Sequence, residues 1–468
     1  MSEQQSKRSK NGETGSYGGG GGCETSSSLP TDPLLPVQEM ILRHQVSSET
    51  DIGGGMENQD DRFIWRSQQQ FPGHSGPSVL ALGVLDGHGR EVGKVAANAA
   101  RHRLVEYLIE HWQEMRDPLT AKMCLVRAHI EAHLFIKLSF KEHLQGQGWE
   151  VQEDPAGFLL KRLPSHHTWS CVHGGTSCSL VVVVGMTMYA ANVGDSSGTL
   201  CTVAPSLVPS MLVPVVDAAL PVGTKSAAQK AYELLPAAGQ TPSTTMIITA
   251  EHSPESPSEF VRLRAFRPRD GDAMQPALSV VYDAPTLDKS RCGPVFALDK
   301  NGTPTVTNKG MYYKTVRKEW ASLVSTPSSA RFQDALAFTR SLGDLHLHTY
   351  GVTHLPEVQV VDLQQVFDAL QVANTEGMHP MAKTTICVVL ATDGVWDNWT
   401  YEDVTRFVMD ASCLNAVLGP NGDGAERVAQ SFMQRNTVYA RRNFGAQADN
   451  ATGIVAYFSI DPAFSQKP

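Results

Sequence analysis

Apolar residues in the first half of the chain fall into one continuous run and two helical stripes. Residues 79–85 form the continuous run, which predicts a buried strand, and the turn sequence Asp86-Gly87-His88-Gly89 follows it directly. Apolar residues recur at helical spacing over 92–112 and again over 122–140, which predicts two successive helices. We expect these helices to lie as a layer over the sheet that contains the strand.

The later part of the chain adds strands that are far apart in the sequence. Residues 179–184 and 187–192 flank Gly185-Met186 and predict a β-hairpin that runs on toward Asp195. The pattern predicts three further elements, namely a buried strand over 384–390, a helix over 425–441 and a last strand over 453–459. Because helices are grouped before and after distant strands, we expect an α+β fold in which sheets pack between helical layers.

Composition divides the chain into a polar N-terminal segment and one long folded domain. Residues 1–45 are rich in Ser, Gly, Gln and Lys and contain the glycine run 18–22, so we expect this segment to be disordered. The predicted folded domain comprises residues 46–462. Two stretches, near 198–245 and near 270–329, fit the pattern poorly, and we expect long insertions or flaps on the domain there.

The charge of the chain narrows the choice of partners. The 468 residues include 39 basic and 48 acidic side chains, which gives a net charge of −9, and 41% of the residues are apolar. The chain can therefore bury a large core, and we expect no nucleic-acid or anionic-membrane partner. The average charge does not reveal whether carboxylates converge on one site, where they would bind cations.

The sequence predicts neither a secretory signal nor a membrane span. Residues 1–12 are polar, and the most apolar long stretch, 203–222, contains four prolines that would leave backbone groups unsatisfied in lipid. The eight cysteines include no CxxC pair, so the sequence suggests neither a zinc site nor a thioredoxin-like motif. We expect free thiols in a reducing compartment, and hence a cytoplasmic or nuclear protein.

Aspartates recur where predicted strands begin or end. Asp86, Asp195 and Asp393 follow apolar runs, whereas Asp60 and Asp449 precede them. Strand ends are rigid positions, so these carboxylates can converge at one rim of a sheet. Converging carboxylates without a His or Cys cluster favour Mg²⁺, Mn²⁺ or Ca²⁺, and two such ions about 3.5–4 Å apart commonly hydrolyse phosphoesters. Any one of these aspartates alone fits an ordinary turn equally well.

Two residues beside Asp86 are further candidates. Gly87 has no side chain, so its backbone carbonyl can approach a metal ion or the waters of that ion. His88 fits either a turn histidine or a general acid that protonates a leaving oxygen, because its ordinary pKa lies near neutral pH. The glycines of residues 87–93 imitate a dinucleotide-binding loop, but the third glycine is one position late and Asp86 would repel a pyrophosphate.

Seven short segments combine these residues with others in one order. They are Asn58-Gln59-Asp60, Leu85-Asp86-Gly87-His88-Gly89, Gly174-Gly175-Thr176-Ser177, Ala191-Asn192-Val193-Gly194-Asp195-Ser196, Leu336-Ala337-Phe338-Thr339-Arg340-Ser341-Leu342-Gly343-Asp344, Ala391-Thr392-Asp393-Gly394-Val395-Trp396-Asp397 and Asp449-Asn450-Ala451-Thr452. In this order, over residues 58–452, they resemble the motifs of the metal-dependent Ser/Thr protein phosphatases of type 2C, the PPM family.

The resemblance implies a four-layer αββα sandwich, in which two antiparallel sheets packed face to face are flanked by helices. It also implies two Mg²⁺ or Mn²⁺ ions at one end of the sandwich. A metal-bridging hydroxide would then attack phosphorus directly, without a phosphoenzyme intermediate. The implied substrates are phosphoproteins that carry phosphoserine or phosphothreonine, and we expect a monomer.

The resemblance also assigns roles to individual residues. The implied metal residues are Asp60, Asp86, Gly87, Asp195, Asp393 and Asp449. In that set Asp86 bridges the two ions, Asp393 and Asp449 complete the shell of one ion, and Asp195 joins Asp393 in holding a third ion. His88 is the implied general acid. Three residues have implied supporting roles, namely Asp344, Asp397 and Asn450.

Three positions depart from the family pattern. Gly55 stands where many relatives have an arginine that grips the substrate phosphate, and Arg62 or Arg66 would have to replace it. Gln59 stands where other members have a glutamate ligand, and Ser197 stands where an arginine is usual. Two alternatives to an active protein phosphatase therefore stay open: a catalytically weak or inactive pseudophosphatase that binds partners, and a hydrolase of small phosphoesters.

Overall fold

The computed structural model describes residues 42–70, 77–214, 241–266, 277–373 and 384–460. By its contacts the chain divides into two units, Met1–Glu39 and Met40–Pro468, and all described residues belong to the second. The sequence predicts a disordered segment over residues 1–45. Residues 1–41 of this segment lie outside the described residues. Its last residues begin strand β1 (Arg43–Asp51), which pairs along its full length with a strand from the other end of the chain.

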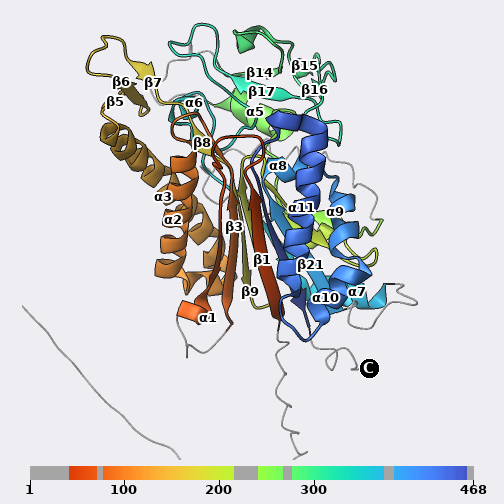
Figure 1. Cartoon of the computed structure of the whole chain (residues 1–468). Coiled ribbons are helices and arrows are strands. Elements are labelled where there is room, and N and C mark those ends of the chain that lie inside the picture. Colours follow the sequence, from red (N-terminus) through yellow and green to blue (C-terminus); the bar gives the residue numbers. More distant parts are fainter. Residues whose placement is uncertain (1–41, 71–76, 215–240, 267–276, 374–383, 461–468) are drawn as a thin grey trace, which may run out of the picture. The chain divides into compact units, whose positions relative to one another are not determined.

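Two antiparallel sheets form the centre of the described unit (Figure 1). The six-stranded sheet has the order β12 (Leu212–Pro214), β20 (Glu357–Asp362), β10 (Thr187–Val193), β9 (Cys178–Val184), β3 (Val79–Leu85) and β2 (Asp61–Arg66). The five-stranded sheet has the order β1, β22 (Ala451–Ser459), β21 (Thr385–Ala391), β11 (Ser197–Cys201) and β13 (Thr245–Ile247). The predicted hairpin of β9 and β10 is confirmed, with Thr187 opposite Val184.

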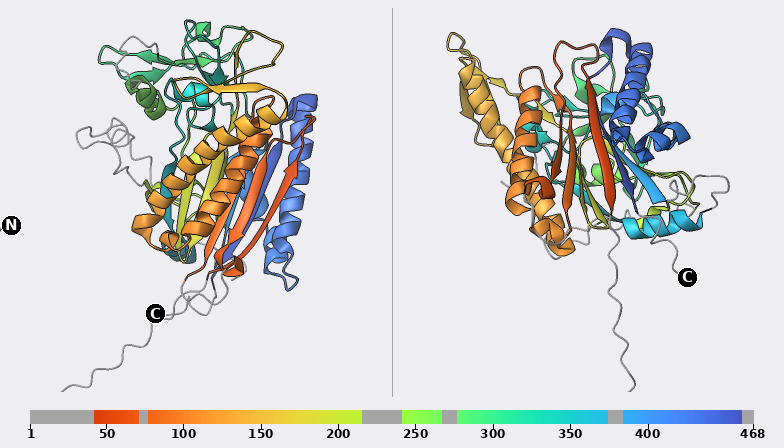
Figure 2. Two further views of the ribbon diagram at one scale, coloured as in Figure 1. Left: turned by 90° about the vertical axis from the view of Figure 1, so that its left-hand side faces the viewer. Right: turned by 60° about the horizontal axis from the view of Figure 1, so that its bottom comes forward.

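Helices cover the outer face of each sheet (Figures 1 and 2). The two predicted helices, α2 (Gly93–His111) and α3 (Pro118–Gly146), share a buried apolar cluster with the six-stranded sheet. Three helices share another cluster with the five-stranded sheet, namely α9 (Tyr401–Val408), α10 (Ala411–Leu418) and α11 (Gly424–Phe444). A third cluster joins Leu82 and Val181 of one sheet to Val388 and Phe458 of the other. The expected mixed fold of antiparallel sheets and helices is therefore present.

Short elements gather at one end of the two sheets (Figure 1). One small sheet consists of β4 (Gly87–His88), β8 (Gly175–Thr176) and β19 (Leu342–Gly343). Another consists of β5 (Glu150–Glu153), β6 (Leu159–Arg162) and β7 (Ser170–Cys171). Further helices in the described residues are α1 (Ser67–Gln70), α5 (Pro257–Ala265), α6 (Leu345–His348), α7 (Leu363–Val372) and α8 (Asp393–Trp396). Of these, α6 and α8 lie at the same end as β8 in Figure 1.

The two expected insertions have different structures. The stretch near 198–245 starts on β11, a strand of the five-stranded sheet, and its residues 215–240 lie outside the described residues. The stretch near 270–329 contributes β14 (Ser279–Tyr282) and β17 (Ser322–Ser325), which pair beside β18 (Ala335–Leu336). It also forms the hairpin of β15 (Phe296–Leu298) and β16 (Pro304–Val306). These strands pack against α5 through a separate buried apolar cluster.

Candidate metal and catalytic site

Strand pairing brings the predicted aspartates to one end of the two sheets. Asp86 follows β3 and Asp60 precedes β2, and these antiparallel strands pair with Leu85 opposite Asp61. In the other sheet, Asp393 follows β21 and Asp449 precedes β22, which are also antiparallel partners. Because the end of each first strand lies beside the start of its partner, each sheet presents two carboxylates at the same rim.

The carboxylates are close enough to perturb one another. Burial raises the pKa of Asp86 well above its usual range, and the charges of Asp393, Asp60 and Asp449 raise it further. Burial likewise raises the pKa of Asp393, with the next contribution from Asp195. Like charges this close need a neutralising partner, either protons or cations. All five predicted aspartates therefore belong to one electrostatic cluster.

Two oxygens of this cluster lack a partner. Asp60 is 7% exposed, and its Oδ2 accepts a hydrogen bond of 2.9 Å from Thr392 Oγ1. Among the described residues, Asp60 Oδ1 and Asp393 Oδ1 are buried oxygens without any hydrogen-bond partner. A buried carboxylate oxygen without a partner is costly, and a hard divalent cation is the ligand that such oxygens fit. The donor set therefore fits Mg²⁺ or Mn²⁺.

The aspartates are spread more widely than the ligands of a single compact ion site. In the part of the chain that the structure describes, the groups of three or more possible ligands within 4.8 Å of one another contain histidine and cysteine, not these aspartates. A centre for two ions distributes its ligands around both ions, so a wider spread is expected for it.

Gly87 is fixed by the close approach of backbone from two other segments. A Cβ atom at Gly87 would lie 2.4 Å from the Gly93 oxygen and 2.6 Å from the Gln59 oxygen. No other residue fits this position without moving the backbone. The segment that follows Asp86 is therefore held tightly against the loop that contains Asp60.

His88 is paired with a carboxylate rather than left in an isolated turn. Its Nε2 lies 2.8 Å from Asp344 Oδ2, and its ring packs edge-on against Phe338 at a centroid distance of 5.3 Å. Burial opposes protonation of His88, but the Asp344 carboxylate outweighs it and raises the pKa of His88 above its usual value. The pairing favours a protonated imidazole, which is the form that a general acid needs.

Sequence reasoning missed a lysine in the carboxylate cluster. Lys314, from the insertion near 270–329, places its Nζ 3.4 Å from Asp195 Oδ2. Burial lowers the pKa of Lys314, but Asp195, Asp397 and Asp393 outweigh it and raise the pKa well above its usual value. Asp195 therefore already has a cationic partner. No motif surrounds Lys314, so only the folded position of the insertion reveals it.

The loop that carries this lysine is docked on α8 and the residues just after it. Val316 N donates a hydrogen bond of 3.1 Å to the Asp397 backbone oxygen. Arg317 donates hydrogen bonds to the backbone oxygens of Trp396 and Trp399. Burial raises the pKa of the Asp397 side chain to about 7. The insertion thus contributes directly to the rim that carries the aspartates.

The supporting asparagine and the two candidate arginines have clear partners. Asn450 Oδ1 accepts a hydrogen bond of 2.7 Å from Gln59 N, so it ties the loop before β2 to the start of β22. Arg62 Nε donates to Ser48 Oγ at 2.9 Å, and Arg66 Nε lies 3.3 Å from His44 Nε2. Both arginines therefore link β2 to the segment of β1, and these contacts do not direct them toward the aspartates.

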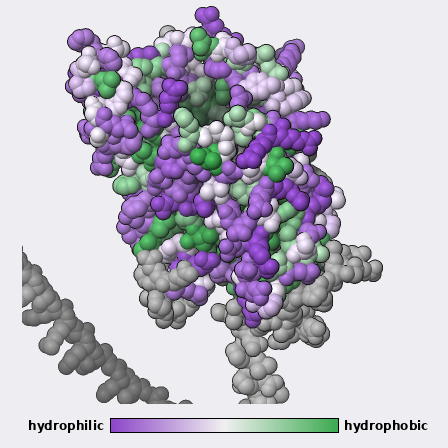
Figure 3. All heavy atoms as spheres, viewed as in Figure 1, coloured by the Kyte–Doolittle hydropathy of each residue, from purple (hydrophilic) through white to green (hydrophobic). Residues whose placement is uncertain are grey.

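The surface above the sheets is polar and indented. The face in Figure 3 is mostly hydrophilic and has a hollow near its upper end. In the described residues, no helix is long and apolar enough to cross a membrane.

These features define a mixed α/β chain with a carboxylate cluster at one end of two antiparallel sheets. Residues 319–438 match the family model described as Protein phosphatase 2C. This stretch contains both Asp344 and Asp393. This part of the chain is therefore similar to the protein phosphatase 2C family.

Solved structures of low sequence identity resemble the chain. A serine-threonine phosphatase 2C from Toxoplasma gondii is 17% identical, with 89% of this chain and 95% of that chain covered and a TM-score of 0.49. A C. elegans sex determining protein is 16% identical, with 88% and 64% covered and a TM-score of 0.46. A bacterial serine phosphatase is 13% identical, with 90% and 99% covered and a TM-score of 0.40.

Proposed function

We propose that the chain is a Mg²⁺- or Mn²⁺-dependent protein phosphatase that hydrolyses phosphoserine and phosphothreonine in proteins. The observation that carries the proposal is the pair of unpartnered buried oxygens, Asp60 Oδ1 and Asp393 Oδ1, within one aspartate cluster. The proposed domain, residues 46–462, is a four-layer αββα sandwich. The apolar cluster between the two sheets and the two clusters between a sheet and its helices support this proposal.

The proposed metal residues are those that strand pairing brings to the rim. Asp86 interacts with both Asp60 and Asp393, so it is the proposed bridge between two ions. Asp449 and the Gly87 carbonyl complete the set. Two divalent ions, when bound, would offset the carboxylate charge and supply an activated water for direct attack on phosphorus.

His88 is the proposed general acid. Its position beside Asp344 keeps the imidazole oriented and favours the protonated form. Because Nε2 faces Asp344, the proton on Nδ1 is the one that would pass to the serine or threonine oxygen as that oxygen leaves phosphorus. Asp344 is a positioning residue, because it acts on the substrate only through His88.

Asp195 has a different proposed role from the other aspartates. Lys314 Nζ lies 3.4 Å from it, so a third ion at Asp195 would have to displace an ammonium group. We therefore assign two resident ions to the centre and treat Lys314 as the counter-charge of Asp195.

A phosphopeptide assay with metal removal tests the function. Hydrolysis of phosphoserine and phosphothreonine peptides should require Mn²⁺ or Mg²⁺, stop with chelator, and fall by about 100-fold or more in Asp393→Asn. Asp368→Asn, at an exposed position on α7, is the matched control and should keep full activity. Metal-dependent turnover that survives Asp393→Asn would contradict the assignment of the site.

A pseudophosphatase is the second candidate. It is favoured by Gly55, and by Arg62 and Arg66, whose side chains contact Ser48 and His44 instead of the aspartates. Metal binding without turnover of any phosphopeptide would support it. A preference of several orders of magnitude for a small phosphoester would instead support a small-molecule hydrolase.

We propose a monomer that acts on phosphoproteins in the cytoplasm or nucleus. All seven cysteines in the described residues carry free thiols, which favours a reducing compartment. Light scattering of the purified chain tests the first point, and imaging of the tagged chain in cells tests the second.

A further inference from the structure

A second group of possible metal ligands lies near the His88–Asp344 pair, and its donors differ from those of the aspartate cluster. Cys171 ends β7, His173 follows two residues later, and His346 lies on α6. One ligand atom from each of the three residues lies within 4.8 Å of the others. Thiolate and imidazole together are the donors of Zn²⁺ sites, whereas Mg²⁺ and Mn²⁺ prefer oxygen.

A carboxylate lies beside the two histidines. Asp334 Oδ2 is 2.8 Å from His173 Nδ1 and 3.7 Å from His346 Nδ1. Burial opposes ionisation of Asp334, but its interactions with His173 and His346 outweigh it and lower its pKa to about 2. Because its Nδ1 lies within hydrogen-bond distance of this carboxylate, His173 has the lone pair on Nε2 free for an ion, an arrangement common among metal-bound histidines.

An unpartnered polar atom points to a missing ligand. His346 is 3% exposed, and its 3.7 Å separation from Asp334 is too long for a hydrogen bond. Among the described residues, His346 Nδ1 is therefore a buried nitrogen without a hydrogen-bond partner. The rings of His173 and His346 lie at 87° to each other with centroids 6.2 Å apart, so they are not stacked. His173 is 41% exposed, which leaves a route by which an ion can enter.

The thiol of the group is protonated until an ion binds. Burial raises the pKa of Cys171 to about 12, and the nearby Asp334 carboxylate adds to the effect. Zn²⁺ binds the thiolate, so binding displaces this proton, as it does at cysteine ligands in general. Without an ion the Cys171 thiol should accordingly be slow to react, because the thiolate is the nucleophile.

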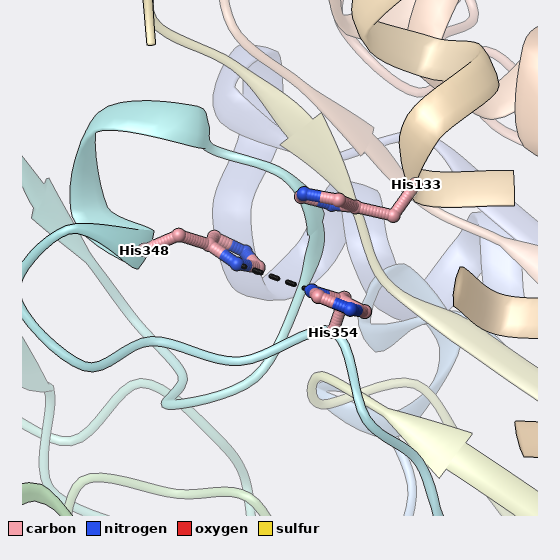
Figure 4. Close-up of side chains that lie close together, drawn as sticks. All are labelled: His133, His348 and His354. Atoms are coloured by element: carbon pink, nitrogen blue, oxygen red, sulfur yellow. Dashed lines mark hydrogen bonds between the residues drawn. The ribbon is translucent and has the colours of Figure 1, made fainter. Parts of the chain in front are cut away.

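The other histidine group of the described residues has a different geometry. The rings of His133, His348 and His354 are stacked and nearly parallel in Figure 4, at 15° for His133 and His354. His133 Nδ1 accepts the N–H of Gly343 at 3.2 Å, so its own proton lies on Nε2 and leaves no lone pair for a metal. This group also contains no thiol or carboxylate. It is therefore the weaker candidate.

We propose that Cys171, His173 and His346 bind one zinc-class ion, with Asp334 as a further ligand or as the group that orients the histidines. This proposal differs from the prediction made from the sequence, which suggests no zinc site because the chain has no CxxC pair. The ligands come instead from two segments far apart in the chain, which no spacing rule detects.

The position of the site indicates a structural role. His346 is two residues from Asp344, the partner of His88, and His173 directly precedes Gly174, whose oxygen accepts a hydrogen bond of 2.8 Å from Asp344 N. A bound ion would therefore fix both segments that hold Asp344. The ion is distinct from those proposed at the aspartate cluster and does not depend on the proposed phosphatase activity.

Cobalt binding to the metal-free full chain tests the proposal without an activity assay. Co²⁺ should give a thiolate charge-transfer band that saturates at one thiolate-bound ion per chain, and Zn²⁺ should abolish the band by displacement. Cys171→Ser should remove the band, and Asp334→Asn should weaken binding by about 10–100-fold. Asp393→Asn should leave the band unchanged, which separates this site from the aspartate cluster.

Two controls keep the result interpretable. Cys413→Ser, which removes a partly buried thiol elsewhere, should retain the band. If Cys171→Ser fails to fold, His173→Asn, a substitution at a partly exposed ligand, tests the site instead, because it should weaken Co²⁺ binding and the thiolate band. A wild-type chain without a thiolate band, or a band that survives Cys171→Ser, would overturn the proposal.

Discussion

His88 Nε2 lies 2.8 Å from Asp344 Oδ2, across 256 residues of sequence. The contact joins the turn after β3 to the start of α6, and the carboxylate raises the pKa of His88 despite burial. Asp344 has a left-handed backbone with φ of 44°, a conformation that Asn also adopts readily. Asp344→Asn should therefore preserve the backbone and remove only the charge.

Asp344→Asn should narrow the pH range of activity. A general acid works below its pKa, so lowering the pKa of His88 moves the alkaline limit of kcat to lower pH. We expect a fall of about 10–100-fold in kcat at pH 8 and a smaller fall at pH 6. In a His88→Asn background, Asp344→Asn should have little further effect. An unchanged pH profile of kcat would show that Asp344 does not act through His88.

Lys314→Met should increase the number of divalent ions that the chain binds. Without the ammonium group, Asp195 lacks its counter-charge and becomes free to hold an ion together with Asp393. We expect Mn²⁺ titration followed by electron paramagnetic resonance to give one additional, weaker equivalent. Lys309→Met, at an exposed position of the same insertion, should bind as the wild type does. Equal stoichiometry in the two variants would count against this role of Lys314.

Gly55→Arg should strengthen binding of the phosphorylated substrate. A Cβ at Gly55 has its nearest neighbour at 3.5 Å, so a side chain fits, whereas a Cβ at Gly54 would lie 2.1 Å from the Ala446 oxygen. An arginine at residue 55 would add a bidentate phosphate contact. We expect KM to fall about tenfold with a smaller change in kcat. Gly146→Arg adds the same charge where a Cβ meets no atom within 4 Å, and KM should then stay unchanged.

Features of the fold that depend on local patterns of apolar and polar residues could be predicted from the sequence. The buried run of β3 and the hairpin of β9 and β10 agree with expectation, because a continuous apolar run predicts burial wherever it pairs. The aspartates at strand ends also converge as expected, since antiparallel pairing brings one strand's end beside the next strand's start.

Features that depend on distant pairing could not be predicted in this way. Strand β1 has only intermediate or exposed residues, and it is a strand because it pairs with β22 from the other end of the chain. Lys314 and the Cys171 group likewise acquire their neighbours only through folding. A charge or thiol carries no local signal of its partner, whereas an apolar stripe does.

His129→Leu should make the fold less sensitive to acid. His129 is fully buried on α3, with its Nδ1 2.8 Å from the Leu125 oxygen and its Nε2 without a partner in the described residues. Burial lowers the pKa of His129 to about 4. The unfolded chain, with a pKa of about 6.5 for this histidine, therefore takes up a proton first as the pH falls.

The sign of the effect follows from that order of protonation. The contribution of neutral His129 is fully present above about pH 6.5, and it is lost at about 1.4 kcal/mol per pH unit as the pH falls toward 4. Urea unfolding at pH 7.5 and pH 5 gives the free energy of unfolding at each pH. Between the two, this free energy should fall less in His129→Leu than in the wild type. In His167→Leu, a substitution at an exposed position, it should fall as much as in the wild type. An equal loss in all three chains would mean that His129 becomes protonated without unfolding.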